Sequence, residues 1–241
     1  PTLSPDPGWG CFPDPNGLAI GRASNGNSYV FTANGGTDDV SVIDLARALE
    51  GNRRAELGRI PGHIAAWGMT VTPDGRHIIV AGGRSQKDNS VGNTISIIDV
   101  DRAASGASDA VVAKILVGTE DPLEPTLPMI PSVTPNGQEV ILPNALANNV
   151  SIVNLELAIS GDPDAEVARI PLFRTDGRPA SPRGSAITSD GRYAVITGGL
   201  ASQPFSQEIG HVYVIDLVSR SVVGTVTGVG NAPYGLTTVS R

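Results

Sequence analysis

Cysteine is nearly absent from this sequence. Among the 241 residues the single cysteine is Cys11, which excludes an internal disulfide framework and every metal centre that needs several thiolates. The three histidines, His63, His77 and His211, lie far apart in the sequence. We therefore expect no close metal-binding group of histidines, and we interpret Cys11 as a small, partly buried side chain.

Basic charge and long apolar runs are also scarce. The only lysines are Lys87 and Lys114, and the formal net charge is −7 at pH 7. Nucleic-acid binding relies on clustered basic charge, so we predict no nucleic-acid partner. No apolar run approaches the roughly 20 residues of a membrane helix, so we predict no membrane span. Residues 1–16, rich in Pro and Gly, lack the order of a signal peptide, so any export signal has been removed or was never present.

What the sequence does contain is a repeat. Four segments alternate in hydropathy and end in an acidic or amide residue: Val40–Asp44, Ile95–Asp99, Val150–Asn154 and Val212–Asp216. Their last positions are separated by 55, 55 and 62 residues. A nearly constant period of this size predicts repeated structural units, and the alternation predicts that each segment is a strand.

A turn and a further strand precede each of these segments. The turns contain Asn or Asp followed by Gly, as in Asp74-Gly75, and the first repeat carries extra residues there, Arg22 to Gly26. Such pairs join adjacent antiparallel strands because they accept positive φ. A short strand of small residues is predicted before the turn, and a fourth strand after the acidic residue. Each repeat is therefore predicted to be a four-stranded antiparallel meander.

A single four-stranded sheet cannot bury both of its faces, so the repeats must stack, and radial stacking of such sheets is a β-propeller. We predict an all-β chain, a β-propeller of four-stranded antiparallel blades with four complete repeats and one extra strand. The predicted blades are about 17–62, 63–122, 123–179 and 180–230, with the extra strand at 231–241, after an N-terminal segment 1–16.

The strand motifs resemble a known repeat family. In the second repeat the chain reads TPDGRHIIVAGG (72–83), NTISIIDV (93–100) and VVAKILVG (111–118). This order resembles the YVTN β-propeller repeat, in which a Pro-Asp-Gly turn leads into a YVAN-like strand and then a TVSVIDL-like strand. The resemblance covers residues 17–241, with Asn154 in place of the usual Asp. It implies the fold but no single function, because similar repeats occur in surface-layer proteins, periplasmic proteins, lactonase-like propellers and parts of redox enzymes.

The number of repeats leaves two arrangements open. Propellers that resemble this family often have seven blades. The four repeats would then be a fragment of a larger, for example seven-bladed, propeller or one part of an assembly. Alternatively, the four blades close on themselves, with the last strand against the N-terminal segment. An open ring exposes blade edges and apolar faces, which predicts self-association through those edges.

Residues just before the predicted innermost strands are expected to converge at one mouth of the central channel. These, with two neighbours in the sequence, are Asn16, His63, Trp67, Glu124, Met129, Arg183 and Tyr234. A guanidinium beside two aromatic rings predicts a site for an anion or a sugar-like ligand. The alternative is that Trp67 and Tyr234 plug the channel and that Arg183 pairs with a carboxylate.

Two long loops between second and third strands mark a candidate binding face. They are Gly82–Gly92 and Gly198–Gly210, and in a propeller both fall on the same face. Loops longer than the repeat requires are where binding residues concentrate. We therefore expect a protein partner or a small ligand at this loop face.

No catalytic motif accompanies the repeat, since the sequence has neither a G-x-S-x-G elbow nor a P-loop. The predicted function is a non-enzymatic binding or scaffold module, periplasmic or secreted, without a cofactor. The alternative is a lactonase-like hydrolase or a redox-associated propeller with a metal or a partner subunit at the channel mouth. For such a metal the sequence offers Asn16, Glu124 and Asn144.

Overall fold

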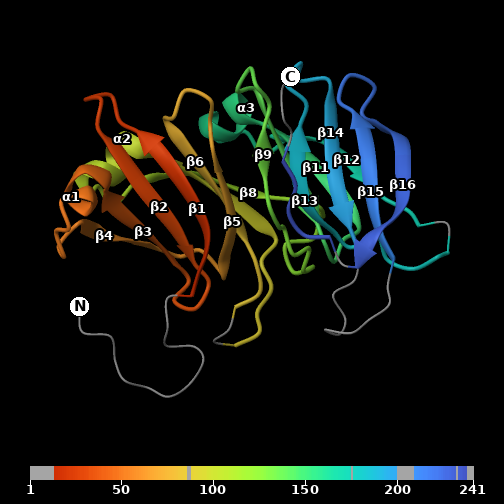
Figure 1. Ribbon diagram of the computed structural model, residues 1–241, viewed down its shortest axis with the longest axis horizontal. Helices are drawn as coiled ribbons and strands as arrows, with labels where there is room; N and C mark the ends of the chain where they lie inside the picture. Colours follow the sequence, from red (N-terminus) through yellow and green to blue (C-terminus); the bar gives the residue numbers. More distant parts are fainter. Residues whose placement is uncertain (1–13, 86–87, 175, 200–208, 232, 238–241) are drawn as a thin grey trace. The chain divides into compact units, whose positions relative to one another are not determined.

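The structure is a computed structural model, and it describes residues 14–85, 88–174, 176–199, 209–231 and 233–237. These residues form four antiparallel sheets of four strands, in which strands that are consecutive in the sequence are neighbours in the sheet (Figure 1). Each sheet is one blade of a propeller-like fold, which confirms the fold class predicted from the repeat. No described helix is long and apolar enough to cross a membrane.

The blades follow one another along the chain. Blade 1 consists of β1 (Pro15–Arg22), β2 (Ser28–Asn34), β3 (Asp39–Asp44) and β4 (Glu56–Pro61). Blade 2 consists of β5 (Ala66–Val71), β6 (His77–Gly82), β7 (Thr94–Asp99) and β8 (Val111–Leu116). Blade 3 consists of β9 (Ser132–Val133), β10 (Glu139–Asn144), β11 (Asn149–Asn154) and β12 (Glu166–Pro171). Blade 4 consists of β13 (Pro182–Ile187), β14 (Tyr193–Gly198), β15 (Ile209–Asp216) and β16 (Ser221–Asn231).

The blades group into two compact units. Unit 1, Pro1–Ile115, holds blades 1 and 2, and unit 2, Leu116–Arg241, holds blades 3 and 4. Each unit has its own apolar core, built around Phe31 and Ile78 in unit 1 and around Ile152 in unit 2, all of which are fully buried. Apolar residues that alternate along the strands fill the space between two adjacent sheets, as the repeat requires.

The acidic or amide residue at the end of each third strand is a cap. In blades 1 to 3 it precedes a short helix: α1 (Leu45–Leu49), α2 (Val100–Ser105) or α3 (Leu155–Ser160). Asp44, Asp99 and Asn154 each accept the backbone N–H three residues further on, at 3.0, 2.9 and 3.0 Å. In blade 4, Asp216 accepts from the N–H groups of residues 218 and 219 in a turn. A side-chain acceptor at this position satisfies N–H groups that the first helical turn leaves unpaired.

Glycine lets the innermost strands approach closely. In unit 1, β1 and β5 lie side by side (Figure 1), and a Cβ added to Gly17 would lie 2.4 Å from the carbonyl oxygen of Trp67. In unit 2, a Cβ added to Gly184 of β13 would lie 2.3 Å from the carbonyl oxygen of Tyr234. Both separations are too short for any side chain, so the spacing of the inner strands depends on these glycines.

In the segment that leads into each innermost strand, one residue other than glycine has a positive φ, in the left-handed region. These residues are Asp14 (φ 45°), Ala65 (φ 44°), Leu127 (φ 53°) and Ser181 (φ 42°). Two of the bends are held by the preceding blade: Asp38 Oδ1 accepts the Ala65 N–H at 2.7 Å, and Asn148 Oδ1 accepts the Ser181 N–H at 2.9 Å. A neighbouring blade therefore fixes a conformation that the local sequence does not favour.

The predicted extra strand at 231–241 is not a strand where the structure describes it. Asn231 ends β16, and residues 233–237 form no strand. Pro233 lacks an N–H, and the Tyr234 carbonyl accepts a hydrogen bond from the Thr197 hydroxyl at 3.1 Å. This segment thus passes along β13 without adding to the sheet.

A buried polar network crosses blade 3. The Asn144 side chain is fully buried, and its Nδ2 donates to Asn149 Oδ1 at 2.8 Å and to Ser151 Oγ at 2.7 Å. Ser151 in turn donates to Glu166, which is paired with Arg169. Because Asn144, Asn149 and Ser151 are buried, each of these side chains depends on its hydrogen-bond partner.

Blade 1 repeats this network with each residue 110 positions earlier: Asn34, Asp39, Ser41, Glu56 and Arg59. Here the Asn34 Nδ2 donates to Asp39 at 2.7 Å and to Ser41 at 2.8 Å. Ser41 donates to Glu56 at 2.9 Å. The only change of residue type is that Asp39 stands where blade 3 has an asparagine.

We predict that Asn144→Ala lowers the free energy of unfolding by about 1–3 kcal/mol, because it leaves two buried acceptors without their donor. Urea denaturation followed by circular dichroism measures the change. Asn27→Ala is the matched control, since Asn27 is exposed and its hydrogen bonds, with Ala23 and Asn25, are made by its backbone. Equal stability of the two variants would contradict the importance of the network.

Candidate functional site

The strongest candidate site lies in unit 2, at Arg183 and Tyr234. The Arg183 Cζ lies 5.5 Å from the centre of the Tyr234 ring, within the range of a cation–π contact. The Arg183 Nε is buried and has no hydrogen-bond partner among the described residues. Burial lowers the pKa of Arg183, and the neighbouring Tyr234 opposes this shift. A partly desolvated guanidinium without a carboxylate partner is arranged to take an anion.

Met129 and Glu124 complete the predicted residues of unit 2. Met129 is 6% exposed, and the N–H of the following residue, Ile130, donates to the Arg183 carbonyl at 3.0 Å, so the segment leading into β9 lies beside β13. Glu124 is exposed and accepts a hydrogen bond from the Thr119 hydroxyl at 2.5 Å. Met129 thus supports this segment from inside, while Glu124 holds the connection that precedes it.

Unit 1 contains the other predicted residues, Asn16, Trp67 and His63. Asn16 lies in β1 and is exposed, and its Nδ2 donates to the Asp14 carbonyl at 2.9 Å. Its amide lies against Gly35, where an added Cβ would be 2.8 Å from Nδ2. Trp67 lies in β5, with its carbonyl against Gly17. Asn16 and Trp67 are therefore on neighbouring inner strands, each one residue inside the strand.

His63 is buried and does not line an open mouth. It is 4% exposed, and neither ring nitrogen has a hydrogen-bond partner among the described residues. Burial, assisted by the nearby positive charge of Lys114, lowers the pKa of His63 to about 4. The ring is therefore neutral at pH 7. The prediction that His63 contributes to a ligand site at the channel mouth is corrected by this burial, because the ring is not open to a ligand.

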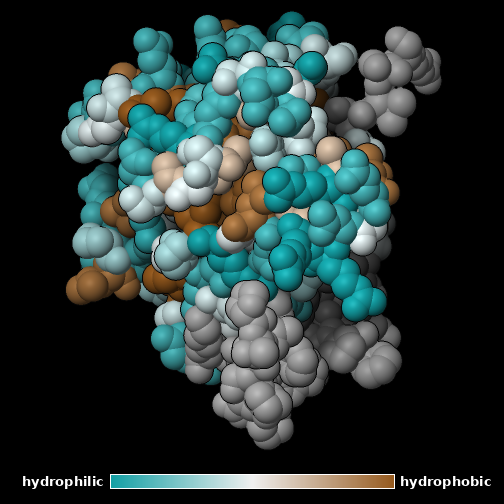
Figure 2. Space-filling view, turned by 90° about the vertical axis from the view of Figure 1, so that its left-hand side faces the viewer, coloured by the Kyte–Doolittle hydropathy of each residue, from teal (hydrophilic) through white to brown (hydrophobic). Residues whose placement is uncertain are grey.

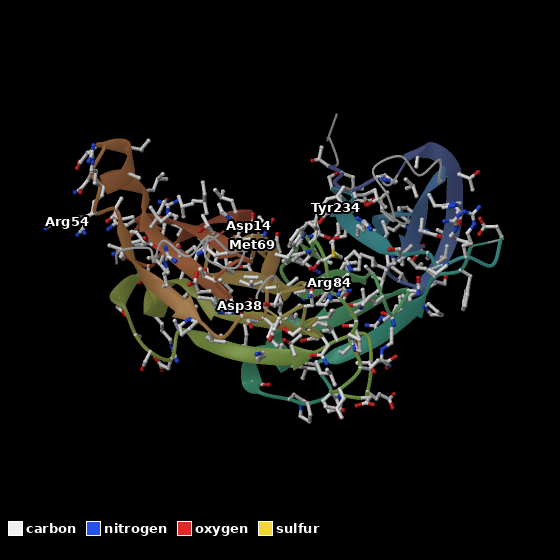
Figure 3. The ribbon with its side chains drawn as sticks, turned by 90° about the horizontal axis from the view of Figure 1, so that it is seen from below. Asp14, Asp38, Arg54, Met69, Arg84 and Tyr234 are labelled. Atoms are coloured by element: carbon white, nitrogen blue, oxygen red, sulfur yellow. The ribbon has the colours of Figure 1, made fainter. Side chains whose placement is uncertain are left out.

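The two long loops are described only in part. Residues 86–87 and 200–208 lie outside the described residues, as does Cys11. The described part of the first loop pairs Arg84 with Val91, and Ser85 donates to Asp38 Oδ2 at 3.4 Å. Asp38 and Arg84 are both labelled in Figure 3. The loop is thus attached to the turn that holds the start of blade 2.

Within unit 2, the two residues considered for a metal, Asn144 and Glu124, do not share an open site. Asn144 is fully buried and belongs to the network of blade 3, whereas Glu124 is exposed on the connection before it. Among the described residues there is no group of three His, Cys, Asp or Glu side chains placed to hold a metal ion.

One pocket in unit 2 has no counterpart in our sequence predictions. It has a volume of about 360 Å³ and is lined by residues that include Phe173, Tyr213 and Arg220. Tyr213 is 1% exposed, its hydroxyl has no hydrogen-bond partner among the described residues, and burial raises its pKa. The ring stacks on His211 at 6.2 Å. The signal in the sequence was Tyr213 itself, which stands where the other third strands have serine.

Comparison with known proteins supports the fold. No family model matches this chain, and no curated protein matches it. Among solved structures, the chain is similar to hydrazine synthase from Kuenenia stuttgartiensis, with a TM-score of 0.65 and 17% sequence identity over 94% of this chain. The likeness is one of fold alone. The chain spans 53% of the length of that hydrazine synthase chain.

We predict that His63 makes stability depend on pH. Its folded pKa of about 4 lies below the unfolded value of 6.5, so the unfolded state binds the proton more readily. The contribution of neutral His63 to the free energy of unfolding is fully present above pH 6.5 and is lost as the pH falls towards 4. Between pH 7.5 and 5 the protein should lose about 2 kcal/mol through this residue.

Denaturant titrations at the two pH values, compared with His63→Leu, measure the effect. The variant should lose about 2 kcal/mol less than the natural sequence over this interval. His77→Gln is the control and should keep the full dependence. An unchanged pH dependence in His63→Leu would show that His63 is not neutral and buried.

Proposed function

We propose that this chain is a non-enzymatic binding module of YVTN-type repeats that takes a carboxylate at Arg183 and Tyr234. The carboxylate belongs either to a small ligand or to an acidic side chain of a protein partner. The observation that carries the proposal is the Arg183 Nε, which is buried and without a partner among the described residues. A buried guanidinium donor is costly unless an acceptor reaches it, and a carboxylate satisfies it with charge-assisted hydrogen bonds.

The surroundings of Arg183 support a ligand over a purely structural role. The other stacked arginine, Arg192, lies 5.0 Å from the Tyr193 ring and is already paired with Asp216 at 3.5 Å. Arg183 has the same aromatic support but no carboxylate among the described residues. Tyr234 is 37% exposed, which leaves the aromatic side of the site open.

The proposal also places the protein outside the cytoplasm, in the periplasm or secreted. The low lysine content, the acidic balance and the resemblance to surface and periplasmic repeats support this location.

A second function, a propeller part of a larger redox enzyme, is favoured by one observation. The chain aligns over 94% of its length with just over half of a hydrazine synthase chain. With one cysteine, these 241 residues contain no C-x-x-C-H haem attachment motif, so this function would need a metal bound by these residues or a redox centre outside them. Native mass spectrometry before and after a chelator separates the two functions: stoichiometric metal lost to the chelator would favour the enzyme.

We predict that Arg183→Met abolishes stabilisation by carboxylates. Succinate, free glutamate and a short Asp/Glu peptide are titrated while the melting temperature is recorded. At ten times the dissociation constant the natural sequence should gain on the order of 1 kcal/mol, a rise of a few degrees. Arg183→Met keeps the apolar part of the side chain but lacks the guanidinium, so the probes should not raise its melting temperature.

Arg192→Met is the matched control, because it removes a stacked arginine that already has a carboxylate partner. It should respond to the probes as the natural sequence does. If Arg183→Met shows the same rise as Arg192→Met, the site is not at Arg183. If no probe raises the melting temperature of the natural sequence up to 20 mM, the carboxylate proposal is wrong.

A further inference from the structure

The pocket beside Tyr213 lies between two consecutive blades of unit 2. The end of β12, with Phe173 after it, forms one wall, and β15 and β16, drawn in blue in Figure 1, form the other. Both walls therefore belong to the same unit. The volume of about 360 Å³ lies within the range of sites that take small molecules.

Blade 4 lacks the polar network that blade 3 has at this place. In blade 3, the Ser151 hydroxyl donates to Glu166 on the next strand. The strand register puts Tyr213 and Val222 at the matching positions of blade 4. Because valine offers no acceptor, the Tyr213 hydroxyl loses the partner that the serine has within its blade. It also has no other hydrogen-bond partner among the described residues.

A glycine makes room for the tyrosine ring. The strand register puts Gly198 where the network of blade 3 has Asn144. A Cβ added to Gly198 would lie 3.1 Å from Cε2 of Tyr213, so the ring is held by close packing. Burial raises the pKa of Tyr213. The hydroxyl is therefore a neutral donor at pH 7.

The segment that leaves blade 3 does not seat its backbone on blade 4 as the preceding segment does on blade 3. There, the Gly118 N–H donates to Glu166 at 2.8 Å. The N–H of the capping residue donates to Ala110 in blade 2 and to Ala165 in blade 3. Counted from these two alanines, Phe173 is the counterpart of Gly118. Its ring is 79% exposed, so a phenylalanine stands at the edge of the pocket where a glycine would let the backbone approach.

The residues on both sides of Phe173 are anchored. Leu172 is buried, and the buried Arg174 side chain is paired with Asp176 through two hydrogen bonds, at 3.0 and 2.6 Å. The exposed Phe173 ring can therefore turn about χ1 while its backbone stays in place. Since the Tyr213 hydroxyl is buried, a ligand reaches it when this ring turns aside.

The charged group in the lining already has partners. Arg220 donates to Glu139 at 3.1 Å and to the Val167 carbonyl at 2.9 Å. Among the described lining residues, the Tyr213 hydroxyl is the buried polar group that lacks a partner. A carboxylate would lose its hydration here without gaining a free positive charge, whereas a neutral carbonyl loses less and satisfies the hydroxyl.

Exposed apolar side chains by themselves do not mark such a site. Unit 1 also exposes Leu18 and Leu49, and Figure 2, which views the side on which blade 1 lies, shows apolar surface among polar residues. The polar side chains of blade 1, however, satisfy one another: Asn34 donates to Ser41, which donates to Glu56. The pocket of unit 2 differs because a buried hydroxyl without a described partner accompanies its apolar walls.

We propose that this pocket binds a small neutral molecule that has an apolar ring and one carbonyl group, and that the carbonyl accepts a hydrogen bond from Tyr213. Phe173 and Val222 contact the ring of the ligand from the two walls. The ligand differs in class from the carboxylate proposed for Arg183. That site offers a charged donor, whereas this one offers a neutral donor in apolar surroundings.

Acetophenone and ethylbenzene test this proposal, because they have the same ring and a similar shape but only acetophenone has a carbonyl. Ligand-observed NMR titrations of the full chain measure both dissociation constants. Tyr213→Phe should raise the dissociation constant of acetophenone about tenfold, the effect of one buried hydrogen bond, and leave that of ethylbenzene unchanged. Tyr193→Phe is the matched control, since Tyr193 lies in β14 outside the lining, and it should bind both probes as the natural sequence does.

Thermal unfolding without ligand gives a second, independent readout. Tyr213→Phe removes a hydroxyl that has no described partner, so its melting temperature should equal or exceed that of the natural sequence. A melting temperature lowered by several degrees would show that the hydroxyl is already hydrogen-bonded, and the proposal would be wrong.

The binding data can also overturn the proposal in three ways. The first is a natural sequence that does not bind acetophenone up to about 10 mM. The second is a Tyr213→Phe variant that keeps its affinity for acetophenone or loses both probes equally. The third is benzoate that binds as tightly as acetophenone and depends on Tyr213. Arg183→Met should bind acetophenone normally, so this outcome is independent of the carboxylate site.

Discussion

The close approach of backbone at the innermost strands is the constraint on which the rest of the structure depends. Gly17 and Gly184 each leave room for the carbonyl oxygen of the next inner segment, at a separation that no side chain allows. This approach brings the flanking sheets near enough to share one apolar core in each unit. It also determines where the first residues of the inner strands stand, and therefore where Arg183 meets Tyr234.

The strands could be predicted from the sequence because their signal is local. Alternation, a turn with Gly, and a fixed period specify a four-stranded meander without knowledge of its neighbours. The three short helices were not predicted, since five or six residues show no clear helical period. Their capping residues, Asp44, Asp99 and Asn154, were visible in the sequence as the last residues of the third strands.

The site was harder to predict because it depends on burial and on partners. Arg183 and Tyr234 could be selected because the sequence placed each of them just before a predicted innermost strand. Their side chains do contact each other in the structure. The same reasoning placed His63 at the channel mouth, although His63 is buried. Tyr213 and the networks of blades 1 and 3 were missed, because a serine or a glutamate in a strand gives no sign that its partners lie 15 residues away.

The left-handed bends at the start of the blades bear on the order in which the chain can fold. Ala65 and Ser181 adopt a conformation that costs roughly 1–2 kcal/mol for a residue other than glycine. In each case the hydrogen bond that holds the bend comes from the blade before it, through Asp38 or Asn148. A ribosome delivers the N-terminal blade first, so the acceptor is already in place when the bend leaves the exit tunnel. During vectorial synthesis, the entry segments of blades 2 and 4 are thus oriented by a neighbouring blade that has already formed.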